Sequence, residues 1–224
     1  MHARAGLDES ATPYFSDGFW NAVATCVAHG EKVGFKPWLY DEDKWPSGAA
    51  GGRTIAANPA RFRAMGLERT TRGAAGPAPV SIHFPQAMFV VAARKTAGGG
   101  IDPGSLTDLT AINRAGGGVW NAPAGNWQIN IFEPHHGRHE LPNYLNPDMV
   151  KEFLNNTYEQ YAARFSRHFG KTIPGVFFDE IFNLVLAWDP ILEERFRARK
   201  GYELRKWLPL LYEDGGPETI RVRC

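Results

Sequence analysis

Cysteine is scarce in this chain of 224 residues, which contains only Cys26 and Cys224. A disulfide framework of the kind that holds small secreted domains together is therefore excluded as the basis of the fold, and the cellular compartment stays open. Long apolar runs are also missing. None approaches the roughly 20 residues that a membrane-spanning helix needs, and the first ten residues include no apolar segment typical of a signal peptide. We expect a soluble protein with no membrane partner.

Neither sign of charge is in excess, since 25 basic residues stand against 24 acidic ones and the formal net charge is +1. This balance argues against nucleic acid or an anionic membrane surface as a partner. Aromatic residues make up 12% of the chain, with seven Trp, seven Tyr and fourteen Phe. Aromatic rings serve hydrophobic cores first, but their flat apolar faces also suit sugar rings. The sequence leaves the oligomeric state open.

One short apolar run stands out because two acids follow it directly. Residues 176–178, Val-Phe-Phe, come after a Pro-Gly pair and end in Asp179 and Glu180. This composition after a helix predicts a strand buried on both faces, as in a parallel sheet. Chemistry in parallel α/β proteins sits at the carboxyl ends of strands, so Glu180 is the best catalytic candidate and Asp179 a neighbour for positioning it. The alternative is that both acids cap the next helix and face water.

A second predicted strand, residues 35–40, ends in the acids Asp41 and Glu42. The loop after it is rich in glycine and small residues, which lets the backbone turn sharply and approach a ligand closely. Trp45 in this loop is either a platform for a sugar ring or a lid that packs on the core. If both strands belong to one parallel sheet, their acidic ends open onto the same edge.

Apolar residues at spacings of three and four predict the helices. The most regular pattern starts at Asn146, a cap residue followed by proline, and ends at Gly170. A cap signal at Ser16 opens another helix, which ends before Gly34. Further helical segments are expected at residues 60–65, 188–200, 204–212 and from 217 onwards.

The middle of the chain changes to a pattern of short strands. Residues 73–79 are rich in glycine, alanine and proline and look like a linker. Residues 118–121 and 127–132 predict the arms of an antiparallel hairpin, joined by a turn that contains glycine. The second arm alternates glutamine and asparagine with apolar residues, which predicts one face turned to the core and one to water. We therefore predict a small all-β insertion spanning residues 74–134.

Residues 133–140 bring together three histidines and two glutamates. Such a cluster invites a metal site, but its spacing matches no familiar ligand helix such as His-Glu-x-x-His. A solvated loop is the favoured interpretation and metal binding the alternative. No residue of the chain is assigned as a metal ligand on this basis.

Residues 38–52 read Trp-Leu-Tyr-Asp-Glu-Asp-Lys-Trp-Pro-Ser-Gly-Ala-Ala-Gly-Gly. This stretch resembles a motif of bacterial glycoside hydrolases related to the α-L-rhamnosidases of family 106. Residues 144–147 and 170–180, a helix start and a strand that ends in Asp-Glu, are similar to the same proteins, as are residues 201–209. The first of these motifs is long and specific, and the others are shorter.

The resemblance implies an α/β fold, a partial (β/α)8 barrel that carries the all-β insertion. Residues 1–73 would form the first part of the barrel, residues 74–134 the insertion and residues 135–224 the continuation. A full barrel takes about 250 residues, so we expect a fragment whose second catalytic carboxylate lies on a later strand. The sequence itself requires no cofactor, while the resemblance implies calcium for some members.

The resemblance further implies hydrolysis of glycosidic bonds by a pair of carboxylates, with Glu180 as the proton donor. A carbohydrate is then the partner, although neither the sugar, the linkage nor the stereochemical outcome can be derived. The remaining site candidates are assigned to substrate binding, and they are Asp41, Glu42, Trp45, Ser47, Asp179 and Asn183.

Two alternatives stay open. One is a non-catalytic carbohydrate-binding protein, or an inactive barrel fragment, in which Trp38, Trp45, Trp120 and Trp127 stack on sugars. The other is a barrel that serves a different reaction, since a fold does not fix chemistry. No phosphate-binding glycine loop and no nucleophile elbow in the sequence supports this last alternative.

Overall fold

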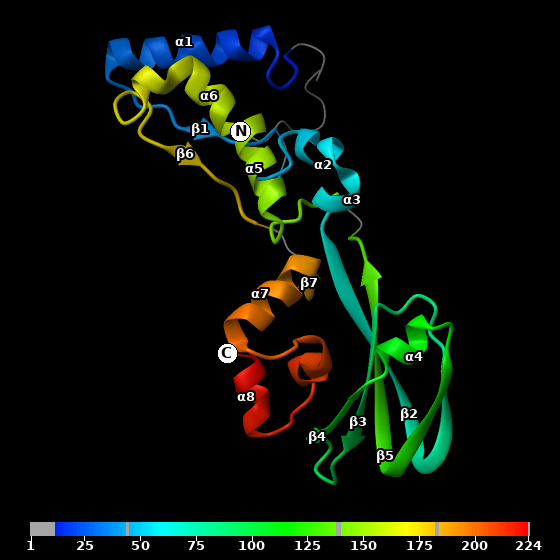
Figure 1. Cartoon of the computed structure of the whole chain (residues 1–224). Helices are drawn as coiled ribbons and strands as arrows, with labels where there is room; N and C mark the ends of the chain where they lie inside the picture. The colour runs from blue at the N-terminus through cyan, green and yellow to red at the C-terminus, as the bar shows by residue number, and fades with distance from the viewer. Residues whose placement is uncertain (1–11, 44, 138–139, 182–183, 224) are drawn as a thin grey trace. The chain divides into compact units, whose positions relative to one another are not determined.

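The chain forms two compact units, each described by itself below (Figure 1). Unit 1 consists of residues 1–64 and 137–183, and unit 2 of residues 65–136 and 184–224. The structure is a computed structural model, and it describes residues 12–43, 45–137, 140–181 and 184–223.

Unit 1 is built mainly of helices around a two-stranded sheet. Its helices are α1 (Asp17–Val33), α2 (Arg53–Ala57), α3 (Pro59–Phe62), α5 (Pro147–Asn156), α6 (Tyr158–Phe165) and the 3-10 turn η1 (Ser166–His168). Its strands are β1 (Leu39–Tyr40) and β6 (Val176–Phe177).

The helix ends of unit 1 follow the capping signals in the sequence. The Ser16 hydroxyl accepts a hydrogen bond from the Phe19 amide at the start of α1, and Gly34 ends the helix in the left-handed conformation. Asn146 caps α5 through the Asp148 amide at 3.0 Å. The single helix predicted up to Gly170 is instead broken at Thr157, where the backbone leaves the helical region and α6 begins. The predicted helix starts at Ser16 and Asn146 are both confirmed.

The two strands of unit 1 pair in parallel, with Leu39 opposite Val176 and Tyr40 opposite Phe177. Leu39 packs with residues of α1 and α6 in a buried cluster, so helices cover this side of the pair. The strands are shorter than predicted. The expected burial of residues 176–178 on both faces is wrong, because Phe177 is 54% exposed and Phe178 46% exposed.

Unit 2 is an antiparallel sheet with helices on its faces, and its strands follow the order β4-β3-β5-β2-β7. The strands are β2 (Met65–Ile82), β3 (Phe89–Lys95), β4 (Ile101–Asp108), β5 (Gly118–His135) and β7 (Ala187–Trp188). The helical segments are α4 (Thr110–Arg114), α7 (Pro190–Lys200), the 3-10 helix η2 (Arg205–Leu211) and α8 (Pro217–Arg223).

Two long strands, β2 and β5, dominate this sheet and pair over almost their whole length (Figure 1). The predicted linker at residues 73–79 lies inside β2, and the predicted hairpin arms at residues 118–132 are parts of β5, so both predictions are wrong. Gly76 reflects close packing of backbone rather than flexibility. A Cβ atom on Gly76 would lie 1.9 Å from the carbonyl oxygen of Pro123 on β5. The pairing register also shifts between Gly76 and Ala78, as at a β-bulge.

Both faces of the sheet carry a hydrophobic core. Strand β3 shows this most clearly, because Phe89, Val91 and Ala93 belong to one buried cluster while Val90 and Ala92 belong to the other. The first cluster also includes side chains of η2 and α8, and the second packs near α4. Each fully buried large side chain contributes about 1.5–3 kcal/mol relative to an exposed one. The C-terminal helices are thus part of the core of unit 2.

The predicted partial (β/α)8 barrel is not observed. A barrel of that class consists of parallel strands that alternate with helices. Among the strands of the described ranges, β1 and β6 alone pair in parallel, whereas all pairings of the five-stranded sheet are antiparallel. Among the helices described, none combines the length and the apolar character that crossing a bilayer would demand.

Candidate functional site

The acids that follow the two strands of unit 1 lie at the same end of the sheet, because β1 and β6 run in parallel. Asp41 comes directly after β1, and Asp179 lies two residues after β6. The hydroxyl of Ser47, in the loop after β1, joins them. It donates to the Asp41 carboxylate at 2.6 Å and accepts from the Asp179 amide at 2.9 Å. We call Asp41, Ser47, Asp179 and Tyr40 the strand-end network.

Asp41 lies at the centre of this network and is fully buried. Its second carboxylate oxygen accepts a hydrogen bond from the hydroxyl of Tyr158 at 2.6 Å. Burial raises the pKa of Asp41 above its usual range, although the hydrogen bonds from Ser47 and Tyr158 oppose the rise. Both of its oxygens are therefore occupied within the protein. Its assignment to substrate binding stays a prediction, and the contacts observed here are those of a support.

Glu42 is also buried, with 3% of its surface exposed. Its carboxylate accepts hydrogen bonds from the amides of Asp43, Ala50 and Gly51 at 2.6–2.9 Å. Gly51 has a φ of 64°, a conformation that glycine adopts without strain. Glu42 thus fixes the shape of the loop that carries Ser47, and this loop geometry is the role its contacts support. Substrate binding by Glu42 stays a prediction.

Asp179 and Glu180 differ in how firmly they are held. One Asp179 carboxylate oxygen accepts from the Tyr40 hydroxyl at 3.1 Å and the other from the Glu180 amide at 2.8 Å. The Glu180 side chain is exposed and has no hydrogen bond or ion pair within the part of the chain that the structure describes. Glu180 therefore combines a fixed backbone with a carboxylate that is open to solvent.

The other two candidates from the sequence have different outcomes. Trp45 is 37% exposed, so the choice between a platform and a lid stays open. Asn183 lies outside the described residues. Of the tryptophans considered for sugar stacking, Trp127 is 5% exposed in the core of unit 2 and Trp120 packs edge-on against it at 5.0 Å.

Five tyrosines contribute to the site, Tyr40 within the strand-end network and four around it, and the sequence analysis did not single them out. The hydroxyl of Tyr161 donates to the carbonyl of Tyr40 at 2.9 Å, that of Tyr144 donates to the carbonyl of Ser47, and that of Tyr14 lies 3.4 Å from the carbonyl of Asp41. Burial raises the pKa of every one of these phenols, and neighbouring carboxylates add to the rise, so they act as neutral donors. The five are Tyr14, Tyr40, Tyr144, Tyr158 and Tyr161.

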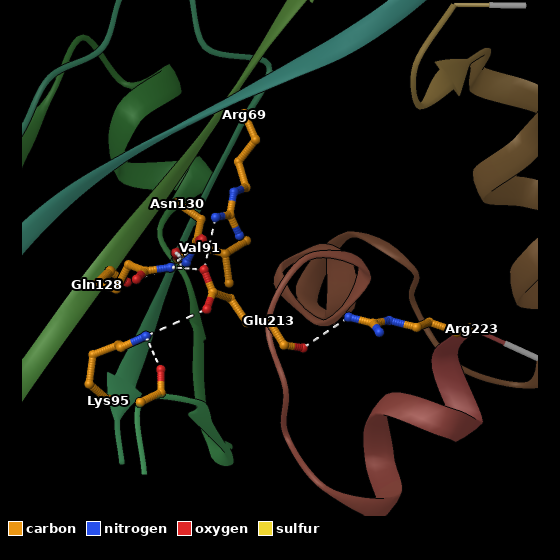
Figure 2. A network of polar contacts seen from close by, with 8 residues as sticks. Arg69, Val91, Lys95, Gln128, Asn130, Glu213 and Arg223 are labelled. Carbon is orange, nitrogen blue, oxygen red and sulfur yellow. Dashed lines mark hydrogen bonds and ion pairs between the residues drawn. The ribbon is translucent and has the colours of Figure 1, made fainter. Parts of the chain in front are cut away.

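A second polar cluster lies in unit 2 and centres on Glu213 (Figure 2). Its carboxylate accepts from Arg69 at 2.8 Å and from Gln128 at 2.9 Å, and it lies 3.5 Å from the ammonium of Lys95. The side chains of Arg69 and Glu213 are 16% and 18% exposed. Burial alone would raise the pKa of Glu213, but these hydrogen bonds and charges hold it below its usual range. We call this group the Glu213 cluster.

The prediction that the polar face of residues 127–132 meets water is wrong. The side-chain amide of Gln128 donates to the carboxylate of Glu213. Asn130 is fully buried and donates to the carbonyl of Val91 at 3.2 Å. The segment around Glu213 therefore covers the polar side of β5. Within unit 2, the guanidinium of Arg223 donates to the carbonyl of Leu210 at 2.8 Å and holds this cover in place.

Metal ligands are not gathered at either cluster. In the ranges that the structure describes, no three His, Cys, Asp or Glu side chains are grouped so that they could hold a metal ion. Of the histidine-rich stretch, residues 133–135 belong to β5 rather than to a loop, and residues 138–139 lie outside the described part. The calcium that the resemblance implies stays a prediction, and no step below depends on it.

Two open hollows lie in unit 2, of about 760 and 520 Å³. The larger lies between α7, η2 and the end of β4, and the smaller beside the turn that links β3 and β4. Of the predicted site residues that the structure describes, none lines either hollow. In comparisons with known proteins, the chain matches no family model, and no curated protein or solved structure shows a significant similarity to it.

Proposed function

We propose that this chain acts on carbohydrate as a glycoside hydrolase, with Glu180 as the acid that protonates the leaving oxygen. The observation that carries the proposal is the parallel pairing of β1 with β6. It brings an exposed carboxylate next to a rigid, fully hydrogen-bonded support. Catalytic groups need such support, since a shift of about 1 Å in their position costs much of the rate.

Each residue of the strand-end network has a separate part in this proposal. Asp179 is fixed from both sides by Tyr40 and by the amide of Glu180, and it sets the backbone from which Glu180 projects. Ser47 ties that backbone to Asp41, and Glu42 shapes the loop that presents Ser47. Asp41 and Glu42 are positioning residues here. The carboxylate that would complete the pair is not assigned to any residue.

A carbohydrate-binding protein without catalysis is the second candidate. The observation that favours it is the full occupancy of the Asp41 and Glu42 carboxylates by internal donors. Of the acids that follow β1 and β6 in the sequence predictions, Glu180 alone then offers a free carboxylate among the described residues, whereas hydrolysis requires two. Exposed aromatic side chains beside the same strands would give such a protein its affinity.

The two candidates are separated by measuring turnover and binding on the full chain. A panel of 4-nitrophenyl pyranosides reports turnover, and calorimetry with the matching methyl pyranosides reports binding. Glu180→Gln is expected to lower kcat by about 10²- to 10⁴-fold and to leave binding unchanged, because it removes the transferable proton and keeps the shape. Glu159→Gln, an exposed glutamate on α6, is the matched control and is expected to be normal.

Near-normal turnover of Glu180→Gln would reject its role as the acid. A wild-type chain that binds a pyranoside and turns over none would replace the hydrolase by the binding protein.

A further inference from the structure

The two faces of the β1–β6 pair are unlike each other. Successive side chains of a strand point to opposite faces. Leu39 and Val176 face the cluster built with α1 and α6. Trp38, Tyr40 and Phe177 occupy the other face, which stays largely uncovered, since Trp38 is 61% exposed and Phe177 54% exposed.

These three rings lie on one face of the strand pair, and two of them, Tyr40 and Phe177, are in contact. The indole of Trp38 lies against Gly175, where an added Cβ atom would come within 2.7 Å of the ring. Glycine at this position therefore lets the ring lie close to the strand. One residue further along, the rings of Tyr40 and Phe177 are neighbours, with their centroids 5.6 Å apart and their planes tilted by 41°. We call Trp38, Tyr40 and Phe177 the aromatic floor.

The aromatic floor ends at the strand-end network. The hydroxyl of Tyr40 belongs to both, since its ring forms part of the floor and its oxygen donates to Asp179. Glu180 follows directly and is exposed. A flat apolar surface thus adjoins hydrogen-bonding groups of negative charge. A purely apolar partner would bury these carboxylates without compensation, which is costly.

A pyranose ring has the complementary pattern, with C–H groups across its face and hydroxyls around its edge. We infer that the aromatic floor is a stacking subsite for a pyranose ring, whose edge hydroxyls donate to the free carboxylate of Glu180. The inference rests on the proposed function for the choice of ligand. It adds the residues that hold the sugar and the class of sugar that fits.

The test replaces one ring by side chains that separate stacking from simple apolar contact. Phe177→Leu keeps the apolar volume but removes the flat face, whereas Phe177→Tyr keeps the face. In the full chain, Phe177→Leu is expected to weaken the binding of methyl pyranosides about tenfold, and Phe177→Tyr to stay within about twofold of wild type. Phe169→Leu, a partly exposed phenylalanine of unit 1 that is not part of the floor, is the matched control.

Equal binding by wild type and Phe177→Leu would overturn the inference, and so would a wild-type chain that binds no methyl pyranoside. A chain that is dimeric by light scattering and becomes monomeric with Phe177→Ser would assign the floor to a second copy and overturn it as well. Circular dichroism spectra that match wild type are the condition for scoring each variant, and Trp38→Phe repeats the test at a second ring.

The failure of this inference can be told apart from failure of the proposed function. If Glu180→Gln keeps its turnover while Phe177→Leu loses binding, the stacking subsite is supported and the role of Glu180 as the acid is rejected. If Glu180→Gln loses turnover while Phe177→Leu keeps both KM and binding, the role of Glu180 as the acid is supported and the stacking subsite is rejected.

Discussion

The strand-end network of unit 1 and the Glu213 cluster of unit 2 both hold a shielded carboxylate, but with opposite kinds of partner. Asp41 is surrounded by neutral hydroxyls, from Ser47 and Tyr158. Glu213 faces two cations, Arg69 and Lys95. Burial therefore prevails at Asp41 and raises its pKa, while the cations and hydrogen bonds prevail at Glu213 and lower its pKa.

The difference indicates what each cluster is for. An ion pair that attaches the C-terminal segment to a sheet is a structural contact, and a carboxylate with a lowered pKa stays charged to maintain it. A buried carboxylate without a cation is less favourable for stability alone, and such groups are found more often at functional sites. This contrast agrees with a candidate site in unit 1, where the parallel pairing of β1 and β6 brings the predicted acids to one edge.

The largest expected effect on stability comes from Glu213→Ala, which leaves Arg69 largely shielded and without its carboxylate. We expect the free energy of unfolding of unit 2 to fall by about 2–3 kcal/mol, less than the roughly 3–5 kcal/mol of a fully buried pair, because both side chains keep some exposure. Hydrogen exchange at the amides of β3 measures it. Glu203→Ala, whose pair with Arg197 is exposed, is the control and should change by less than about 1 kcal/mol. Equal effects of the two variants would remove the structural role of the Glu213 cluster.

A smaller decrease in the free energy of unfolding, now of unit 1, is expected when Asp41 is replaced. Asp41→Ala removes the acceptor of two hydroxyls and should destabilise unit 1 by about 1–3 kcal/mol. Asp41→Asn keeps an acceptor oxygen and should cost less. Exchange at the amides of β1 and β6 reports the effect, with the exposed Asp43→Ala as control. If Asp41→Asn lowers turnover although the stability is nearly kept, the network positions Glu180. If turnover also stays normal, the network supports the fold alone.

The pH dependence of the two units should have opposite signs. Ionised Glu213 stabilises unit 2 above its unfolded pKa of about 4.3, and this contribution is lost as the pH falls through the lowered folded pKa. Folded Asp41 binds its proton more tightly than unfolded Asp41, so the free energy of unfolding of unit 1 falls as the pH rises from about 3.9 through the raised folded pKa. Urea unfolding followed by exchange in each unit measures both slopes. Glu213→Gln and Asp41→Asn should each abolish one of them, and slopes of the same sign would break the comparison.

Added salt should produce the smallest change in the free energy of unfolding, and it should do so only in unit 2. Raising sodium chloride from physiological concentration screens the charges of Arg69, Lys95 and Glu213, and we expect a loss of less than about 1 kcal/mol in unit 2 because the cluster is partly shielded. The strand-end network contains no cation among its hydrogen-bonded residues and should not respond. A larger response at β1 and β6 than at β3 would contradict the assignment of partners.

Local signals in the sequence predicted the parts of the fold that depend on neighbouring residues. Ser16 and Asn146 cap helices as expected, since a cap needs only the next turn of chain. The pairing of β2 with β5 joins residues as far apart in the sequence as Gly66 and His135, and no local pattern reveals it. Gly76 was assigned to a linker for the same reason. The backbone that excludes a side chain there belongs to β5, which is distant in the sequence. The barrel that the resemblance implied was wrong, because β1 and β6 pair in parallel whereas the five-stranded sheet is antiparallel.

The candidate site was predictable to a similar extent. The rule that acids at strand ends share an edge located Asp41 and Asp179, which Ser47 joins through hydrogen bonds. It could not tell which acids would be buried, because that depends on the surrounding tyrosines. Tyr158 and Tyr161 fit the apolar stripe of a helix, and their spacing of three was a signal that both hydroxyls point to one place.

The most direct test of the central claim is the effect of the leaving group on Glu180→Gln. A general acid matters most when the departing oxygen is basic, and hardly at all when the departing phenolate is stable without a proton. We predict that Glu180→Gln loses about 10²- to 10⁴-fold in kcat/KM on alkyl pyranosides and less than about tenfold on 2,4-dinitrophenyl pyranosides. Equal losses on both substrates, or no loss on either, would contradict the assignment of Glu180 as the proton donor.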